Sequence, residues 1–148
     1  MLLGKLLKSA SHKYRKIDVK GISFDSRKIK KKYIFFAIEG NKTSGAKFIE
    51  EAIKKGASLI VVNKSTKYKN PDIKLILVND VRKSLSEACS NFYNKKPKNI
   101  IAVTGTNGKS SVAHFFYQIL SLNKISGASM GTLGITSKKH NKKTKLTT

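Results

Sequence analysis

The sequence predicts an α/β protein, with a first α/β domain at residues 1–95 and the start of a second α/β domain at residues 96–148. Three observations predict this. Apolar strand-like runs alternate with segments whose apolar residues recur at helical spacing. A strand-like run at 99–104 leads into a glycine-rich turn and then a helix, which is how a nucleotide-binding sheet begins. A polar stretch around Pro97 separates the two parts, because proline stops the preceding helix.

The first domain opens with two predicted strands. Residues 19–24 alternate as a half-buried strand, and residues 33–38 form an apolar run that ends at the turn signal Glu39-Gly40. Between the two strands, Asp25-Ser26-Arg27 is a polar corner. Taken without other information, this corner is a side-chain-capped turn of a common kind.

A helix and two further strands follow. Apolar residues at helical spacing predict a helix over 46–55, and Gly56 is placed to end it as a C-cap. Strands are predicted at 58–62 and 75–78.

The last helix of the first domain begins after the strand at 75–78. Asn79 or Asp80 can cap it. Its spacing directs five residues toward a core, namely Val81, Leu85, Ala88, Phe92 and Tyr93. The single cysteine, Cys89, is expected to be a small, partly buried residue of this helix.

The second part carries fewer elements. A helix is predicted over 109–122 and a strand over 126–130, followed by Gly131-Thr132-Leu133-Gly134 and a lysine-rich turn through 137–145. One or two strands and one helix cannot bury both faces of a sheet. We therefore expect this part not to be a stable domain by itself.

The net charge of +23 raises the question of nucleic-acid binding. Lysines are scattered over nearly every segment, and the only arginines are Arg15, Arg27 and Arg82. This distribution favours general attraction of anionic substrates over a dedicated nucleic-acid surface. No apolar run reaches the roughly 20 residues that span a bilayer, and the first residues do not read as a signal peptide. We expect a cytoplasmic protein with no membrane partner.

The glycine-rich turn is the strongest chemical signal. Its backbone N–H groups at a helix N-terminus predict an ATP-phosphate site formed by Gly105, Thr106, Asn107, Gly108, Lys109, Ser110 and Ser111. Lys109 would reach the terminal phosphates as the catalytic residue, and Ser110 would ligate Mg²⁺. Val103 stands where the general phosphate-loop pattern has a glycine, so the loop is a variant. No Asp or Glu follows Glu87, so the Mg²⁺ site lacks a carboxylate in this part of the chain.

The loop Thr-Gly-Thr-Asn-Gly-Lys-Ser resembles that of the Mur ligases, the ATP-dependent amide-forming enzymes of peptidoglycan precursor synthesis. The upstream segments 24–27, 33–40, 45–49 and 52–57 resemble the N-terminal domain of the third and fourth ligases of that series. Gly131-Thr132-Leu133-Gly134 and the final Thr147-Thr148 favour the third. One departure is Ser44-Gly45-Ala46, where the family usually has an acidic or polar residue before or after glycine.

The resemblance implies a substrate site in the first domain. The resemblance implies that Phe24 and Ser26 lie at the nucleotide-sugar site. It implies that Asn41, Lys42 and Thr43 lie beside the diphosphate. It also implies that Thr147 and Thr148 contact the sugar-peptide part of the substrate. Hydroxyl, amide and ammonium donors suit phosphate and uracil oxygens. Without the resemblance, residues 41–43 would read as a solvated loop.

The activity that the resemblance implies is addition of a diamino acid, meso-diaminopimelate or L-lysine, to UDP-N-acetylmuramoyl-L-alanyl-D-glutamate through an acyl phosphate, by a monomer. Family members continue into further domains, so we expect an N-terminal fragment that is inactive alone. Three alternatives stay open. They are the related ligase that adds D-alanyl-D-alanine, a non-catalytic UDP-sugar-binding module, and a basic nucleic-acid-binding protein.

Overall fold

The computed structural model describes residues 1–8, 11–40, 43–68, 70, 73–139 and 141–142. The chain divides into two compact units, Met1–Lys96 and a second unit that begins at Pro97. Each unit is described by itself. The assignment of substrate binding to one part and ATP binding to the other stays a prediction.

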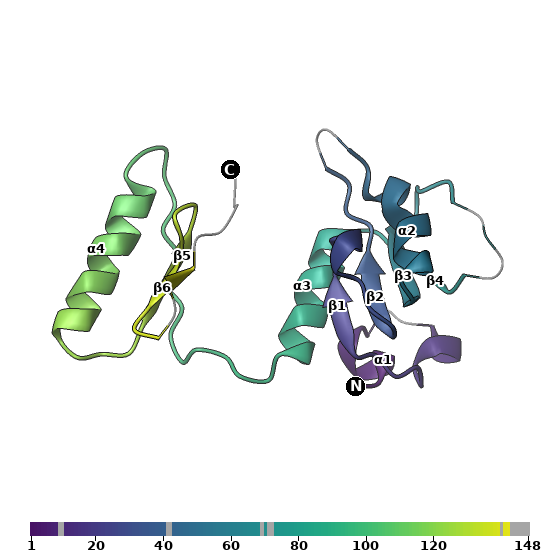
Figure 1. The fold of residues 1–148 in the computed structure, drawn as a ribbon, viewed down its shortest axis with the longest axis horizontal. Helices are drawn as coiled ribbons and strands as arrows, with labels where there is room; N and C mark the ends of the chain where they lie inside the picture. The colour runs from purple at the N-terminus through teal and green to yellow at the C-terminus, as the bar shows by residue number, and fades with distance from the viewer. Residues whose placement is uncertain (9–10, 41–42, 69, 71–72, 140, 143–148) are drawn as a thin grey trace. The chain divides into compact units, whose positions relative to one another are not determined.

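The first unit is built on a four-stranded sheet (Figure 1). Its strands are β1 (Gly21–Ser23), β2 (Tyr33–Phe36), β3 (Ala57–Asn63) and β4 (Leu75–Val78). They lie in the order β1-β2-β3-β4, and every neighbouring pair is parallel. The predicted α/β class is confirmed for this unit, and each of the four strands overlaps its predicted segment.

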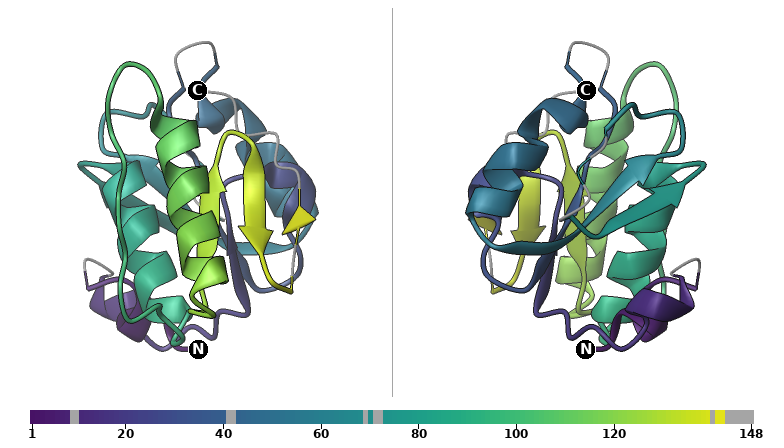
Figure 2. Two further views of the ribbon diagram at one scale, coloured as in Figure 1. Left: turned by 90° about the vertical axis from the view of Figure 1, so that its left-hand side faces the viewer. Right: turned by 90° about the vertical axis from the view of Figure 1, so that its right-hand side faces the viewer.

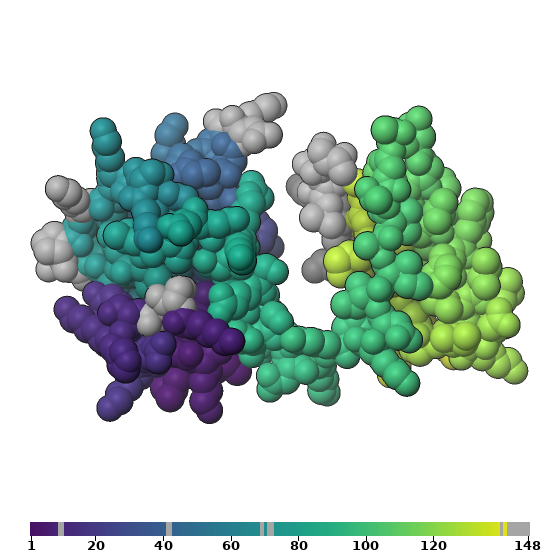
Figure 3. Space-filling model, turned by 180° about the vertical axis from the view of Figure 1, so that it is seen from behind, coloured from purple at the N-terminus to yellow at the C-terminus, as the bar shows by residue number. Residues whose placement is uncertain are grey.

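Helices cover both faces of the sheet. The helix α2 (Ile49–Lys54) packs on one face, whereas α1 (Leu3–Leu6) and α3 (Val81–Phe92) lie together on the other (Figures 1 and 2). Figure 3 shows the purple N-terminal segment lying against the teal of α3. Short 3-10 turns lie at His12–Tyr14, Ser26–Lys28 and Gly45–Phe48 of the same unit.

Successive residues of the central strands point to opposite faces of the sheet and belong to two separate cores. In β2, Ile34 and Phe36 belong to the core under α1 and α3, whereas Phe35 belongs to the core under α2. β3 repeats this pattern with Leu59 and Val61 against Ile60 and Val62. A parallel strand that is buried on both faces reads as a continuous apolar run, which is why these strands were visible in the sequence.

Local chemistry fixes the ends of the helices. The Asp80 carboxylate accepts a hydrogen bond from the Lys83 backbone N–H at 3.0 Å, as expected for an N-cap of α3. Gly56 has φ +92° just after α2, a conformation that favours glycine. Cys89 is half-buried in α3, and burial raises the pKa of its thiol. Tyr93 was expected in the core but is 59% exposed, because the helix ends at Phe92 and Tyr93 is extended.

The second unit combines one helix with a small antiparallel sheet. The helix α4 (Lys109–Leu122) packs along β5 (Ala128–Gly131), as Figure 2 shows. β6 (Gly134–Ser137) pairs with β5, and β7 (Asn141–Lys142) pairs with β6. The sequence predicted α4 with the same bounds and β5 within two residues. It predicted no strand at β6, and it assigned the residues of β7 to a lysine-rich turn.

The predicted strand at 99–104 is wrong for this structure. These residues are described but join no ladder, because no strand of the described residues runs alongside them to supply hydrogen-bond partners. Ile100 and Ile101 are 79% and 63% exposed, so their apolar side chains have no core to enter. The structure therefore lacks the first strand that was predicted for an ATP-binding domain, and the assignment of this unit to such a domain stays a prediction.

Apolar side chains on α4 lie open to solvent. No residue of α4 is buried, although most of its turns carry large apolar residues. We call the following set the open face of α4, namely Val112, Phe115, Phe116, Ile119 and Leu122, each between 41% and 82% exposed. Among the described residues, no helix has both the length and the hydropathy to cross a membrane.

Candidate functional site

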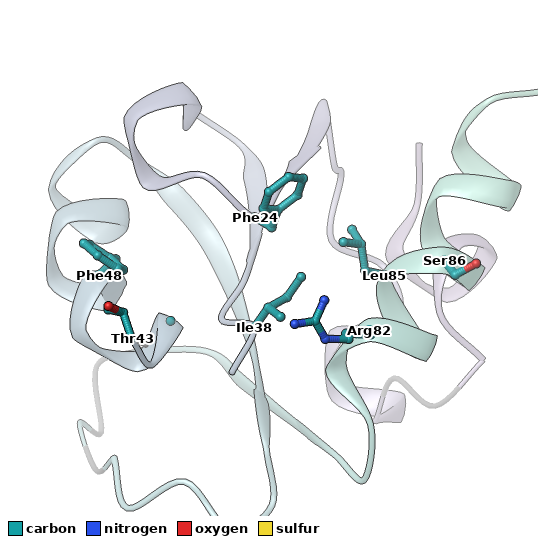
Figure 4. A pocket seen from close by; sticks show the side chains of 8 residues that line it. Phe24, Ile38, Thr43, Phe48, Arg82, Leu85 and Ser86 are labelled. Carbon is teal, nitrogen blue, oxygen red and sulfur yellow. The ribbon is translucent and has the colours of Figure 1, made fainter. Parts of the chain in front are cut away.

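The first unit holds a pocket of about 520 Å³ at the carboxyl end of its sheet (Figure 4). Its lining comes from the residues that follow β1 and β2, from the turn before α2, and from the first half of α3. The lining residues are Phe24, Ile38, Thr43, Gly45, Phe48, Arg82, Leu85 and Ser86. Ligands of open parallel sheets bind outside the carboxyl ends of the strands, which makes this pocket the candidate substrate site.

The loop after β2 is held close to the strand it leaves. The Gly45 N–H donates to the Ile38 carbonyl at 2.9 Å. A Cβ at Gly45 would lie 2.6 Å from the backbone N and O of Ile38, so only glycine fits this approach. The Ser44 hydroxyl donates to Glu39 Oε1 at 2.8 Å, and the Gly40 N–H donates to the Thr43 carbonyl at 3.1 Å. These contacts bring Thr43 and Gly45 to the pocket.

Arg82, a residue of α3, forms a hydrogen bond to the loop after β2. It lies in the first turn of the helix, and its Nη2 donates to the Glu39 carbonyl oxygen at 3.1 Å. In Figure 4 its guanidinium lies beside Ile38, on the pocket side of α3. Among the described residues that line the pocket, Arg82 is the one that carries a charge.

The corner after β1 presents Phe24 to the pocket. Phe24 is 65% exposed, and the next residues form a compact polar turn. The Asp25 carboxylate accepts from the Arg27 backbone N–H at 3.0 Å and from Arg27 Nε at 2.9 Å. The bonds from the Arg27 side chain are the largest reason that the pKa of Asp25 is lowered, and the same pair raises the pKa of Arg27.

Ser26 faces away from solvent and is only 5% exposed. Its hydroxyl donates to Glu51 Oε2 at 2.6 Å, and Lys55 Nζ donates to Glu51 Oε1 at 2.7 Å. The hydrogen bond from Lys55, followed by that from Ser26, lowers the pKa of Glu51. Ser26 therefore ties the corner to α2 and is not among the residues that line the pocket.

The structure brings together two of the seven predicted substrate residues, because Phe24 and Thr43 line one pocket. Ser26 lies beside Phe24 in sequence, with its hydroxyl on Glu51. Four predicted residues lie outside the described part of the chain, namely Asn41, Lys42, Thr147 and Thr148. All seven assignments stay predictions about substrate.

Sequence reasoning missed the contribution of α3 to this pocket. Leu85 was expected in the core, and it is partly buried against the core while its side chain also lines the pocket. Helical spacing gave no reason to place Arg82 or Ser86 at a site. One feature of the sequence could have drawn attention to Arg82, because it is one of only three arginines among 31 lysines and arginines.

The predicted phosphate loop forms the N-terminus of α4. Gly108 is the N-cap with φ +74°, and Gly105 has φ +145°. Both values favour glycine, and a Cβ at Gly108 would meet no atom within 4 Å. The turn therefore depends on backbone conformation at these positions, and Thr106 and Asn107 lie exposed between them.

Lys109 curls back over the loop. Its Nζ donates to the Gly105 carbonyl at 2.6 Å and to the Thr106 carbonyl at 3.1 Å. Ser110 Oγ lies 3.3 Å from Thr132 Oγ1 in the turn between β5 and β6, and Ser111 is exposed. The ammonium of Lys109 and the first-turn amides of α4 thus lie at one end of a 14-residue helix, whose dipole favours anions there.

The residues present do not by themselves make a magnesium site. Mg²⁺ is usually held by one or two carboxylates together with substrate phosphates and water. The described residues contain no cluster of three or more His, Cys, Asp or Glu that could hold a metal, and no acidic residue occurs after Glu87. Ser110 stays a predicted ligand that would supply one oxygen.

Comparisons of sequence place the chain among known proteins. A family model described as "Mur ligase family, catalytic domain" matches residues 18–96. UDP-N-acetylmuramoyl-L-alanyl-D-glutamate--2,6-diaminopimelate ligase of Rickettsia montanensis is 48% identical over 123 residues, covering 82% of this chain and 25% of the relative. The ligase of the same name from Caldanaerobacter subterraneus is 38% identical over 138 residues, covering 90% and 28%. The chain spans about a quarter of the length of these relatives.

Two solved structures resemble the fold. A UDP-N-acetylmuramoyl-L-alanyl-D-glutamate--2,6-diaminopimelate ligase matches with a TM-score of 0.73 at 24% identity, over 95% of this chain and 29% of that chain. A MurF ligase of Thermotoga maritima, solved in complex with ADP, matches with a TM-score of 0.56 at 26% identity, over 73% and 24%. The first of these shows likeness of fold alone.

Proposed function

The chain belongs to the Mur ligase family, and from that membership we propose that it supplies the nucleotide-substrate unit and the ATP-phosphate loop of a diaminopimelate-adding ligase. The substrate would be UDP-N-acetylmuramoyl-L-alanyl-D-glutamate, the second substrate a diamino acid, and the energy source ATP with Mg²⁺. The reaction would take place in the cytoplasm and would be a step of peptidoglycan precursor synthesis.

The observation that carries this proposal is the extent of the likeness to the Rickettsia montanensis relative. A continuous stretch covering 82% of a 148-residue chain cannot avoid residues 105–111. The aligned stretch therefore spans the positions of the glycine loop as well as most of the first unit. Diaminopimelate appears in the names of eight relatives that are 37% to 48% identical to this chain, which favours it over L-lysine.

The proposed reaction has two steps. A carboxylate oxygen of the D-glutamyl residue attacks the γ-phosphorus of ATP, and ADP leaves with the electrons of the broken P–O bond. The amine of the diamino acid then attacks the acyl carbon, phosphate leaves, and the amine loses a proton. ATP is needed because a free carboxylate is a poor acyl donor, so the energy of phosphate transfer makes its carbonyl reactive.

The residues of this chain would contribute positioning and charge. The first-turn amides of α4 would hold the phosphates, and Lys109 would exchange its present contacts with Gly105 and Thr106 for the terminal phosphates. Mg²⁺ would neutralise phosphate charge when bound, with Ser110 as one ligand. The pocket at Phe24 and Thr43 would hold the uridine diphosphate end.

The test is a chimera. Residues 1–148 are joined to the remaining three quarters of the Rickettsia montanensis relative, and ADP release is measured with and without each substrate. We expect release that requires both UDP-N-acetylmuramoyl-L-alanyl-D-glutamate and meso-diaminopimelate. Lys109→Ala should lower it by about 100-fold or more, because it removes a preorganised positive charge.

Lys138→Ala is the matched control, since Lys138 is an exposed lysine of the same unit. A folded chimera that releases ADP without the nucleotide substrate, or that accepts D-alanyl-D-alanine in place of diaminopimelate, would contradict the proposal. The 148-residue chain alone is expected to form no amide. Amide formation by that purified chain would contradict the expectation that the reaction needs the region which the relatives have beyond the part they share with this chain.

A non-catalytic UDP-sugar-binding module is the second candidate. The observation that favours it is the separation of the pocket, which lies wholly within the unit Met1–Lys96. If this second candidate is correct, the first unit should bind a uridine nucleotide and the chimera should be inactive. Measuring both on the same samples separates the two functions.

A further inference from the structure

We propose that Arg82 selects an anionic ligand in the pocket of the first unit, by donating to the diphosphate of a nucleotide. This inference rests on the function proposed for that pocket. It assigns a specificity-determining role to a residue of α3, whereas the residues predicted from the sequence lie on the loops after β1 and β2 and at the end of the chain.

The chemistry of the lining points to Arg82. Of the eight lining residues that the structure describes, seven are neutral, and five of these are apolar or glycine. A pocket of that kind gains specificity from a small number of placed polar groups. Thr43 and Ser86 offer hydroxyls, and within the described part of the lining Arg82 alone offers a charge.

The guanidinium is already held in place. Nη2 donates to the Glu39 carbonyl at 3.1 Å, while the Glu39 carboxylate accepts from the Ser44 hydroxyl. Arg82 makes no ion pair within the described part of the chain. A guanidinium carries five N–H donors in a planar fork, so donors remain for a second partner. That fork matches phosphate oxygens in pairs, which a lysine ammonium cannot do.

The other two arginines have structural partners. Arg27 pairs with the Asp25 carboxylate at 2.9 Å, and Arg15 donates to the Lys8 carbonyl at 3.3 Å. Lys83, the next residue of α3, is exposed and does not line the pocket. The chain therefore places an arginine at the pocket and a lysine beside it on the same helix, which provides a matched pair for experiment.

The aromatic residues suit the rest of such a ligand. Phe24 and Phe48 line the pocket with 65% and 43% of their surface exposed. Exposed aromatic faces accept a planar base by stacking. A nucleoside diphosphate presents both parts at once, with a base for the aromatic residues and an anion for Arg82.

The experiment compares UDP with uridine, by calorimetric titration of the 148-residue chain and its Arg82→Gln, Arg82→Lys and Lys83→Gln variants. The wild-type chain should bind UDP at least about tenfold more tightly than uridine, because charge-assisted hydrogen bonds are made only to UDP. Arg82→Gln should lose that preference and keep its uridine affinity within about twofold. Arg82→Lys should keep part of the preference, and Lys83→Gln should keep all of it.

The outcomes separate the two ideas. If the wild-type chain binds neither UDP nor uridine, the proposed function of the pocket fails and this inference fails with it. If it prefers UDP and Arg82→Gln prefers UDP equally, Arg82 has no such role while the function stands. If Arg82→Gln and Arg82→Lys weaken UDP and uridine by the same factor, Arg82 only positions the loop, and the inference is overturned. Thermal unfolding of each variant shows that the fold is retained.

Discussion

At the scale of single residues, hydrogen bonds connect Ser26 through Glu51 to Lys55. A buried hydroxyl, a carboxylate and an ammonium are joined at 2.6 Å and 2.7 Å. The contacts connect the corner that carries Phe24 to the helix α2. Because the hydroxyl is only 5% exposed, its partner is needed to satisfy it.

This arrangement predicts a pH-dependent contribution to stability. The pKa of Glu51 is lowered from its usual value of 4.5, first by the bond from Lys55 and then by that from Ser26. A lowered folded-state pKa means stabilisation that is complete above the unfolded value and lost as pH falls through the folded one. Glu51→Gln should therefore be less stable than the wild type at pH 7, and the difference should shrink below about pH 4.5.

Thermal unfolding from pH 7 to pH 3 measures this difference. Lys55→Gln removes the largest cause of the shift and should show the same trend. A difference between wild type and Glu51→Gln that stays constant over the whole range would contradict the assignment.

The residues of the pocket were only partly predictable. The family resemblance named Phe24 and Thr43 as substrate residues, and both line the pocket, although their role toward substrate stays a prediction. Arg82 was not found, because a helix periodicity distinguishes core from solvent but gives no reason to place an exposed residue at a site. Its position depends on how α3 lies against the loop after β2, which is a property of the assembled unit.

At the scale of elements, two glycines allow close approach in different ways. A Cβ at Gly21 in β1 would meet ring atoms of Tyr33 at 2.3 to 2.6 Å. A Cβ at Gly45 would meet backbone atoms of Ala37 and Ile38 at 2.6 to 2.7 Å. A ring can rotate away, whereas the backbone at the end of β2 is fixed by the sheet.

Gly45→Ala should therefore destabilise the first unit more than Gly21→Ala. We expect a loss of about 2 to 3 kcal/mol for Gly45→Ala, at the upper end of the usual overpacking range, and less for Gly21→Ala. Urea unfolding followed by circular dichroism measures both. Equal losses, or a larger loss for Gly21→Ala, would show that the loop after β2 moves more easily than its contacts indicate.

Strands that are covered on both faces of a sheet could be predicted from the sequence, whereas a short polar strand could not. β2, β3 and β4 read as apolar runs because both faces of the sheet are covered. β7 has two residues, Asn141 and Lys142, and its pairing with β6 leaves no apolar pattern in the sequence. The apolar run at 99–104 was assigned as a strand, but pairing needs a neighbour that its own sequence does not supply.

At the scale of the whole molecule, the two units differ in how they are stabilised. The first unit has two buried cores, one on each face of its sheet. The second has no buried residue in α4, and its described sheet is a three-stranded antiparallel one. Its fold therefore relies on local hydrogen bonds more than on burial.

Hydrogen exchange should show this difference directly. Backbone amides of β3 should exchange only on global unfolding, whereas those of α4 should exchange at least about 100-fold faster, because helices with few buried contacts open locally. A chain of residues 1–96 serves as the control and should protect β3 as strongly as the full chain does. Equal protection of α4 and β3 would contradict this difference in stabilisation.

The open face of α4 also decides how molecules of this protein behave toward one another. At low ionic strength, a charge of +23 makes them repel, so the exposed phenylalanines of neighbouring molecules are kept apart. Raising the salt concentration shortens the range of that repulsion, and sulfate in particular also strengthens apolar association. The protein should therefore self-associate and salt out at unusually modest ammonium sulfate, and mild chaotropic anions should disperse it.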